Sequence, residues 1–214
     1  MKNKEVRYIV ADSLEVRADD EPPVIEGYAA VFNEETVIGD WFREVIRPGA
    51  FKRAISEKQD VRALWNHDAN YVLGRTKSGT LKLSEDKRGL KIQIDPPDTQ
   101  SARDLVESIR RGDVDQMSFA FIASEEKWPK NSKADEDKLP LRELIDLDLY
   151  DVSPVTYPAY EATSVGVRSA EDIYNDHLQS LAGVDFGDDD DAGAAAMDRD
   201  RACAAAELIR LTTN

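Results

Sequence analysis

The sequence contains a single cysteine, Cys203, and only two histidines, His67 and His177, in 214 residues. One cysteine excludes an internal disulfide framework and is typical of a reducing compartment. Two distant histidines and a cysteine near the C-terminus do not have the spacing of a zinc site, and no glycine-rich phosphate loop occurs. We therefore expect neither a bound metal nor a cofactor.

Positive charge is also scarce, since 28 lysines and arginines stand against 43 aspartates and glutamates, a net charge of −15. A nucleic-acid groove and an anionic membrane surface both require clustered basic residues, so this balance disfavours both partners. No apolar run approaches the roughly 20 residues that span a bilayer, and the first ten residues lack the apolar core of a secretory signal. We expect a soluble, cytosolic protein.

Short β-rich runs dominate the chain up to about residue 168, among them "VRYIV", "EGYAAVFN", "VRALWNH", "VDQMSFAFIA" and the hairpin pattern "GTLKLSEDKRGLKIQID". Apolar spacing indicates a short helix at 50–58 and a clearer one at 101–111, which Gly112 ends and which Ser101 and Asp104 begin in the manner of a capping box. A barrel removes exposed strand edges. We therefore predict a mixed α/β, mainly β fold: a closed or nearly closed β-barrel with peripheral helices.

The composition changes near residue 170. The run "GDDDDAGAAAMDRD" is rich in like charge and poor in large apolar groups, which is typical of a flexible linker. The last segment is rich in alanine and favours a helix. We predict a β-barrel domain at 1–169, followed at 170–214 by an acidic linker and an alanine-rich helical tail.

A candidate nucleophile lies in the strand "QMSFAFI". Side chains alternate along a strand, so Met117 and the two phenylalanines share one face, and Ser118 shares the other with Ala120. The small face around Ser118 is expected to be open to a substrate backbone. A serine hydroxyl needs a base to remove its proton, and histidine suits this role because its ordinary pKa of about 6.5 is close to working pH. His67 in "LWNHD" is the candidate base.

A carboxylate commonly orients such a histidine through its second ring nitrogen. The run "RELIDLDLYDVS" offers four: Glu143, Asp146, Asp148 and Asp151. Acids on the solvent side of a strand are ordinary, but Asp151 continues an apolar face and directly precedes the bend expected at Pro154. Residue types alone leave a second interpretation open, in which His67 is a hydrogen-bonded strand residue and Ser118 a neutral strand filler.

Six segments, in this order and spacing, change that balance: "EGYAAVFN", "VIRPGAFKRAI", "ALWNHDANYVLGRT", "GTLKLSEDKRGLKIQ", "ARDLVESIRRGDVDQMSFAF" and "LYDVSPVTYPAYEAT". Together they cover roughly residues 25–165. In these segments the sequence resembles the prohead (capsid-maturation) proteases of tailed bacteriophages, which are related to the herpesvirus assemblins. The resemblance implies a serine protease with a β-barrel wrapped by helices.

Carried over residue by residue, the resemblance implies that the family's histidine is His67 and its nucleophile Ser118. In the herpesvirus enzymes a second histidine is the third member, but here His177 lies beyond the expected barrel. An acid must take its place, and Asp151 fits best, with Asp148 and Asp146 as reserves. Arg75 is either a contributor to the oxyanion site or one half of a structural salt bridge.

The resemblance implies a serine endopeptidase that cleaves the scaffolding region of the major capsid protein, and itself, inside the prohead in the host cytoplasm. Self-association into a homodimer would follow the herpesvirus relatives. The C-terminal helix is either a tail without a partner or a segment that docks on the scaffold. Two other functions stay open: a non-catalytic capsid-assembly or scaffold module that keeps the protease fold, and an acidic protein-binding module.

Overall fold

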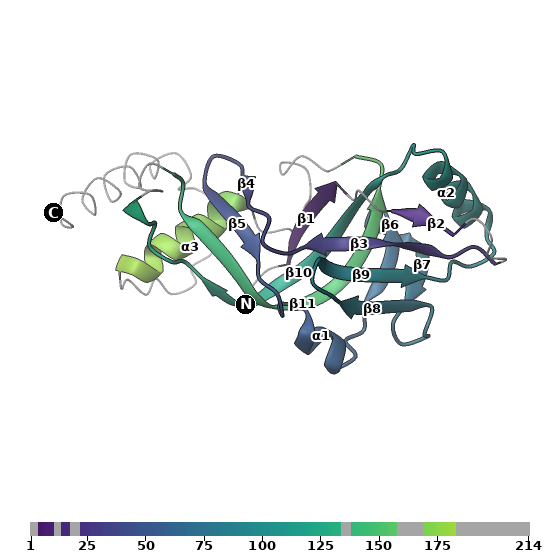
Figure 1. Cartoon of the computed structure of the whole chain (residues 1–214), viewed down its shortest axis with the longest axis horizontal. Helices are drawn as coiled ribbons and strands as arrows, with labels where there is room; N and C mark the ends of the chain where they lie inside the picture. The colour runs from purple at the N-terminus through teal and green to yellow at the C-terminus, as the bar shows by residue number, and fades with distance from the viewer. Residues whose placement is uncertain (1–3, 11–13, 18–21, 134–137, 158–168, 183–214) are drawn as a thin grey trace, which may run out of the picture. The chain divides into compact units, whose positions relative to one another are not determined.

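The computed structural model describes residues 4–10, 14–17, 22–133, 138–157 and 169–182. Contacts divide the chain into two units, Met1–Asp176 and His177–Asn214. Within the described residues, one sheet of the first unit consists of β1 (Glu5–Val10), β4 (Thr36–Ile38), β5 (Phe42–Ile46), β6 (Arg62–Trp65), β7 (Asp68–Arg75), β10 (Gln116–Lys127) and β11 (Leu141–Val155) (Figure 1). A second sheet consists of β2 (Glu15–Val16), β3 (Ile25–Val31), β8 (Leu81–Glu85) and β9 (Gly89–Ile94). The helices are α1 (Lys52–Ser56), α2 (Gln100–Arg110) and α3 (Ala170–Ala182).

Local sequence signals account for several of these elements. β8 and β9 form the expected hairpin, and α1 and α2 lie within two residues of the expected helices. Gly112 follows α2 with φ +77, a conformation that costs glycine no steric clash. The capping box at Ser101 is wrong: the side chain of Thr99 accepts a hydrogen bond from the N–H of Ala102 at 3.3 Å. Thr99 is the residue in extended backbone directly before the first turn, where a cap is needed.

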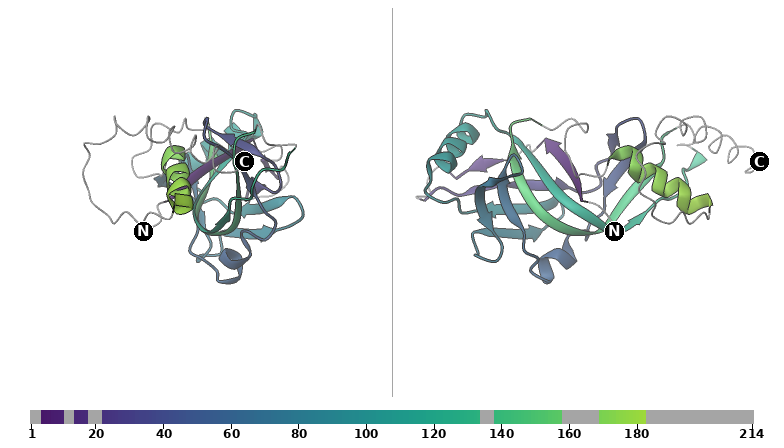
Figure 2. Two further views of the ribbon diagram at one scale, coloured as in Figure 1. Left: turned by 90° about the vertical axis from the view of Figure 1, so that its left-hand side faces the viewer. Right: turned by 180° about the vertical axis from the view of Figure 1, so that it is seen from behind.

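The long strands β10 and β11 run antiparallel side by side and form the centre of the larger sheet (Figure 1). The other edge of β10 pairs with β1, which lies beside it in both the front and rear views (Figures 1 and 2). The other edge of β11 pairs in parallel with β5 over Leu141–Leu144 and, further along, with β6 at Asp151 and Val152. β11 therefore divides the sheet into two branches.

The gap between the branches is covered by α1 and its flanking residues. The N–H of Leu147 donates to the carbonyl of Ala50 at 3.0 Å, just before α1. The N–H of Leu149 donates to the side-chain oxygen of Gln59 at 2.9 Å, just after it. Two N–H groups that face the gap therefore have partners without a neighbouring strand.

The mainly β character is confirmed, but the closed form of the expected barrel is not. In the part of the chain that the structure describes, no strand pairing joins the two sheets, and the larger one curls as an open half-barrel. A closed barrel requires one sheet whose first and last strands pair. Here the branching at β11 sends β5 and β4 away from β6 and β7, so the apolar faces of both sheets meet in one core without a shared ladder.

A smaller apolar cluster lies over β4 and β5, where Phe42 contacts Trp128 and the start of α3 buries Ala170 and Ile173. Within the described residues, no helix is both long enough and apolar enough to cross a membrane. The acidic run, Cys203 and the alanine-rich segment lie outside the described residues. The division into a domain at 1–169 and a tail at 170–214 therefore stays a prediction.

Candidate active site

His67 lies in a two-residue turn that joins β6 to β7. Trp65 pairs with Asp68, and between them Asn66 and His67 have φ +54 and +57. Positive φ at both central positions is the geometry of a type I′ turn, which matches the twist of a hairpin and normally takes glycine second. A side chain in this left-handed region costs about 1–2 kcal/mol. A histidine here is kept against that cost, which is typical of functional sites.

The imidazole of His67 contacts two groups from different strands. Its Nε2 lies 2.5 Å from the Oγ of Ser118 on β10, and its Nδ1 lies 2.5 Å from the Oδ1 of Asp151 on β11. The sequence separates Ser118 from His67 by 51 residues and Asp151 from His67 by 84. This order of hydroxyl, imidazole and carboxylate lets the ring take the hydroxyl proton while the carboxylate stabilises the resulting imidazolium.

A β-bulge directs Asp151 to this site. Ala120 pairs with Asp151 and the next residue, Phe121, pairs with Leu149, so Tyr150 is an extra residue in β11. Bulges re-aim side chains and are frequent beside active sites. Without the bulge, Asp151 would continue the apolar face of Leu149, as regular alternation predicts. With it, Asp151 shares the face of Ser118.

Asp151 is buried, and burial by itself opposes its ionisation. The hydrogen bond and charge of His67, the charge of Lys4, and a hydrogen bond from Ser153 outweigh burial and hold the pKa of this carboxyl below its ordinary value. The Nζ of Lys4 lies 3.4 Å from Oδ2, and the hydroxyl of Ser153 donates to Oδ1 at 3.0 Å. Asp151 is therefore ionised at neutral pH.

The other acids of β11 have different partners. Asp146 accepts from Arg53 at 2.6 Å, and Asp148 pairs with the same arginine at 2.7 Å while it accepts from Gln59 and Ser124. Glu143 pairs with Arg47. The structure therefore brings Asp151, and not the reserves, to His67.

Two further residues singled out in the sequence lie elsewhere. Arg75 on β7 donates two hydrogen bonds of 2.6 Å to the carboxylate of Asp60, which is a structural ion pair. His177 lies on α3 and is partly exposed.

Ser118 is 0% exposed, so the expectation of an open face around it is wrong. The reason is β1, which pairs with β10 so that Tyr8 lies opposite Ser118. The Oγ of Ser118 lies 2.9 Å from the main-chain carbonyl oxygen of Arg7, as well as 2.5 Å from His67. The N-terminal strand therefore covers the hydroxyl.

The model of the caudovirus prohead serine proteases matches residues 12–176. The chain belongs to this family. It is 28% identical over 184 residues to the prohead protease of Enterobacteria phage HK97, an alignment that covers 79% of this chain and 75% of that protein. The solved capsid assembly protease of bacteriophage T4 has a TM-score of 0.44 and 10% identity, over 72% of this chain and 98% of that one. The resemblance read from six segments is confirmed.

Buried charges anchor the N-terminal strand of this prohead protease family member. Arg142 on β11 is 0% exposed and donates to both oxygens of Glu5 at 2.6 and 2.9 Å, to Glu44 at 2.8 Å, and to Glu126. Arg7 donates to Glu44 at 2.6 and 3.0 Å and to Glu5 at 3.0 Å. Three carboxylates and two guanidinium groups thus form one network, which we call the β1 anchor. The sequence analysis gave no signal for this network.

Replacing Arg142 with methionine is expected to lower the free energy of unfolding by about 3–5 kcal/mol, because buried carboxylates would lose their shared cation. Urea unfolding of the Ser118→Ala chain with and without the change measures this. Arg47→Met is the matched control, since Arg47 and its partner Glu143 are partly exposed, and should cost less than about 1 kcal/mol. Equal losses for both arginines would contradict the assignment of the β1 anchor as a buried network.

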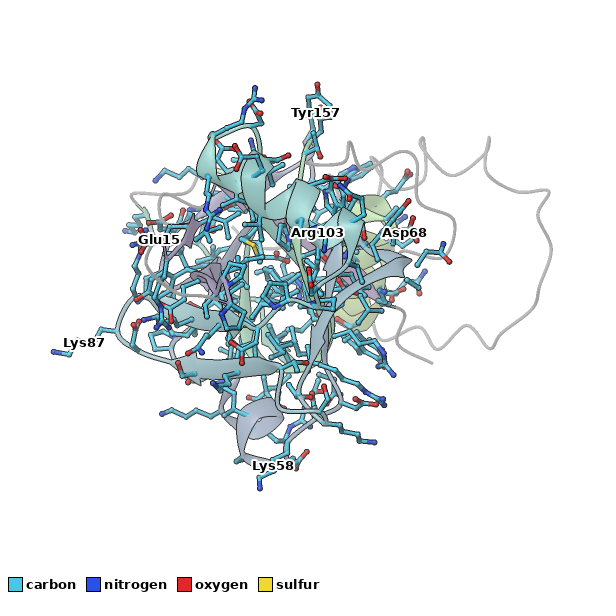
Figure 3. All side chains as sticks on the ribbon, turned by 90° about the vertical axis from the view of Figure 1, so that its right-hand side faces the viewer. Glu15, Lys58, Asp68, Lys87, Arg103 and Tyr157 are labelled. Atoms are coloured by element: carbon cyan, nitrogen blue, oxygen red, sulfur yellow. The ribbon has the colours of Figure 1, made fainter. Side chains whose placement is uncertain are left out.

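Asn66 fastens the turn of His67 to the end of β11. Its main-chain N–H donates to the carbonyl of Pro154 at 3.0 Å, and its side-chain oxygen accepts from the N–H of Thr156 at 2.9 Å. The next residue, Tyr157, projects outward and is 80% exposed (Figure 3). Because Asp151 lies on the same strand, this clamp ties His67 to the segment that carries its carboxylate. Sequence reasoning missed Asn66, although asparagine favours left-handed turn positions.

Replacing Asn66 with glycine is expected to lower kcat about 10-fold with little change in KM, because glycine keeps the turn but loses the side-chain clamp. Asn66→Asp retains an acceptor oxygen for Thr156 and should recover most of the loss. Steady-state cleavage kinetics measure both, with Asn70→Gly on exposed β7 as the control. A variant in which kcat stays at the wild-type value would show that Asn66 does not position His67.

Proposed function

We propose that the chain is a serine endopeptidase of capsid maturation that cleaves the scaffolding region of the capsid protein inside the prohead, in the host cytoplasm. The observation that supports this best is the placement of His67 between Ser118 and Asp151, with 2.5 Å to each. Membership of the prohead serine protease family supports the same class of reaction. Recognition of the capsid protein and association into a homodimer are part of this proposal.

In the proposed mechanism, the Oγ of Ser118 attacks the carbonyl carbon of the scissile bond while Nε2 of His67 takes its proton. When the tetrahedral intermediate collapses, His67 gives this proton to the leaving amine, and an ester remains on Ser118. Water then attacks the ester, with His67 again as base, and releases the carboxylate product and free Ser118. Throughout, Asp151 holds the Nδ1–H and stabilises the imidazolium.

The position of β1 supports self-cleavage, because the main chain at Arg7 already lies against Ser118. The hydroxyl has one proton, and the carbonyl of Arg7 at 2.9 Å competes with His67 at 2.5 Å for it. The contact is made by the carbonyl oxygen, so attack on the carbonyl carbon requires a small shift of the strand. We propose that the bond between Arg7 and Tyr8 is cut, and that β1 excludes other substrates until it leaves.

The test uses purified chain, capsid precursor and an organophosphonate that reacts with activated serines. Without the reagent, the precursor should shorten, and the chain should lose the mass of residues 1–7. With the reagent, cleavage should stop, and the adduct should be found on the peptide that contains Ser118. A precursor that stays intact while shells still assemble would overturn the peptidase and favour the non-catalytic scaffold module; an adduct elsewhere would overturn the assignment of Ser118.

A further inference from the structure

The N-terminal strand presents two charged side chains on one face. Glu5 and Arg7 are two residues apart in β1, so their side chains point to the same side of the strand. Both point away from Ser118, since they lie opposite Phe121 and Phe119, the bulky face of β10. Glu5 is 1% exposed and Arg7 is mostly buried. Arg7 donates to Glu5 at 3.0 Å, but each side chain also has its own main partner outside β1, Glu44 for Arg7 and Arg142 for Glu5. We call the surroundings of these two side chains their pockets.

The side chain of Arg7 contacts a carboxylate and an aromatic ring. Glu44 on β5 receives two hydrogen bonds from the guanidinium, at 2.6 and 3.0 Å, and the ring centre of Phe121 lies 5.6 Å from the guanidinium carbon. Burial opposes ionisation of Glu44, but the charges of Arg7 and Arg142 outweigh it and hold its pKa below the ordinary value. A paired fork of this kind selects arginine over residues of similar size.

The pocket of Glu5 is basic. Two nitrogens of Arg142 donate to its two carboxylate oxygens at 2.6 and 2.9 Å. Arg142 also donates to Glu44 on β5 and to Glu126 on β10, so two of its three carboxylate partners lie outside β1. Glu44 likewise has a partner outside β1, since it accepts from Arg142 at 2.8 Å.

When β1 leaves, both pockets are vacated. Arg142 then loses its two hydrogen bonds to Glu5, and Glu44 loses its two hydrogen bonds from Arg7. A buried charge that has lost a partner favours the binding of a ligand with the opposite charge. A substrate strand that pairs with β10 as β1 does would place its side chains in these same two pockets. A segment with the wrong charge at either position would instead add repulsion.

We propose that Glu44 and Arg142 determine the cleavage specificity of this protease. Glu44 binds a basic residue whose carbonyl is attacked, and Arg142 binds an acidic residue two positions before it. The substrate class is therefore an extended segment with the pattern acidic, any residue, basic, cut after the basic residue. This inference rests on the proposed function, because it assumes that Ser118 attacks a strand seated as β1 is.

The test uses the self-processed chain and synthetic peptides that copy residues 2–12, with capsid precursor as the reference substrate. Changing the arginine of the peptide to glutamine, or its glutamate to glutamine, should each lower kcat/KM about 10- to 100-fold. Lysine in place of the arginine keeps the charge without the fork, so its kcat/KM should fall between those of arginine and glutamine. Mass spectrometry identifies the cut bond and its rate.

The matched enzyme variant is Glu44→Gln, for which the preference for arginine over glutamine should shrink to within about 3-fold. Glu143→Gln is the control, because Glu143 pairs with Arg47 away from β1, and its preference should equal that of wild type. If Glu44→Gln does not fold, the peptide series still decides the matter. If the precursor is cleaved but all peptides are cut at equal rates, or none is cut, the proposed specificity is wrong. If the precursor itself stays intact, the proposed protease activity is wrong.

Discussion

Ser118→Ala is expected to lower the rate of cleavage about 10⁴- to 10⁶-fold, both for the capsid precursor and for the bond after Arg7. Alanine removes the hydroxyl oxygen of the proposed nucleophile, while the pairing of β10 with β1 and β11 is untouched. His67→Ala should lower the rate about as much, and the double variant little more, because the proposed mechanism has Ser118 and His67 act as one unit.

Mass spectrometry of the co-expressed chain and precursor measures this loss. Ser124→Ala is the matched control: it is the same change on the same strand, but Ser124 donates to Asp148, away from His67. Its cleavage rate should stay within about 3-fold of wild type, the range expected of a surface hydroxyl. Wild-type processing by Ser118→Ala would refute the serine mechanism.

Asp151→Asn is expected to lower kcat about 10³- to 10⁴-fold with the fold intact. The carboxylate accepts the Nδ1–H at 2.5 Å, whereas an amide can turn its NH₂ to the ring and stabilise the wrong tautomer. The amide also lacks the charge that balances the imidazolium. The rate of self-cleavage after Arg7 in the full chain, with wild type as reference, is a single turnover and measures the chemical step.

The controls for Asp151 are Asp146→Asn and Asp148→Asn, the same change on the same strand at acids whose arginine partner is Arg53. Both should keep kcat within about 3-fold of wild type. Loss of activity in Asp148→Asn with full activity in Asp151→Asn would exclude Asp151 as the third member and leave His67 and Ser118 standing.

The lowered pKa of Asp151 predicts the direction in which stability changes with pH. A carboxyl whose folded pKa lies below the unfolded value of about 3.9 adds stability above that pH and loses it as pH falls through the folded pKa. Between pH 7 and pH 2 the free energy of unfolding of Ser118→Ala should therefore fall. The fall should be smaller in the double variant Ser118→Ala/Asp151→Asn, which lacks this carboxyl. Parallel curves would mean that Asp151 is not held ionised by its partners.

Much of the site follows from local signals, and the rest depends on contacts between distant segments. Alternation in "QMSFAFI" correctly separates Ser118 from the phenylalanines, and the family motifs indicate His67. Asp151 was selected among four acids, yet it reaches the site through an extra residue, Tyr150, that simple alternation does not include. A bulge depends on the pairing with β10, and nothing within β11 alone specifies it.

That β1 covers Ser118 could not be predicted either, because this also depends on pairing between distant strands. β1 pairs with a strand more than 100 residues away, and its anchor depends on Arg142, a charged residue in a stretch that reads as an ordinary alternating strand. Closure of the barrel was expected from the general cost of free edges, but Ala50 and Gln59, on either side of α1, accept hydrogen bonds from the backbone of β11. Long-range geometry decided both outcomes.

One consequence of the order β1, β10, β11 concerns solubility. Loss of β1 would make β10 an edge strand of the sheet. Its unpaired backbone amide and carbonyl groups would then lie beside Met117 and the phenylalanines. An exposed edge strand can pair with any extended polypeptide. Such pairing would help to bind a substrate strand, but it would also favour aggregation of the protein with itself. If β1 is cut off as proposed, the processed chain should aggregate more readily than the full chain.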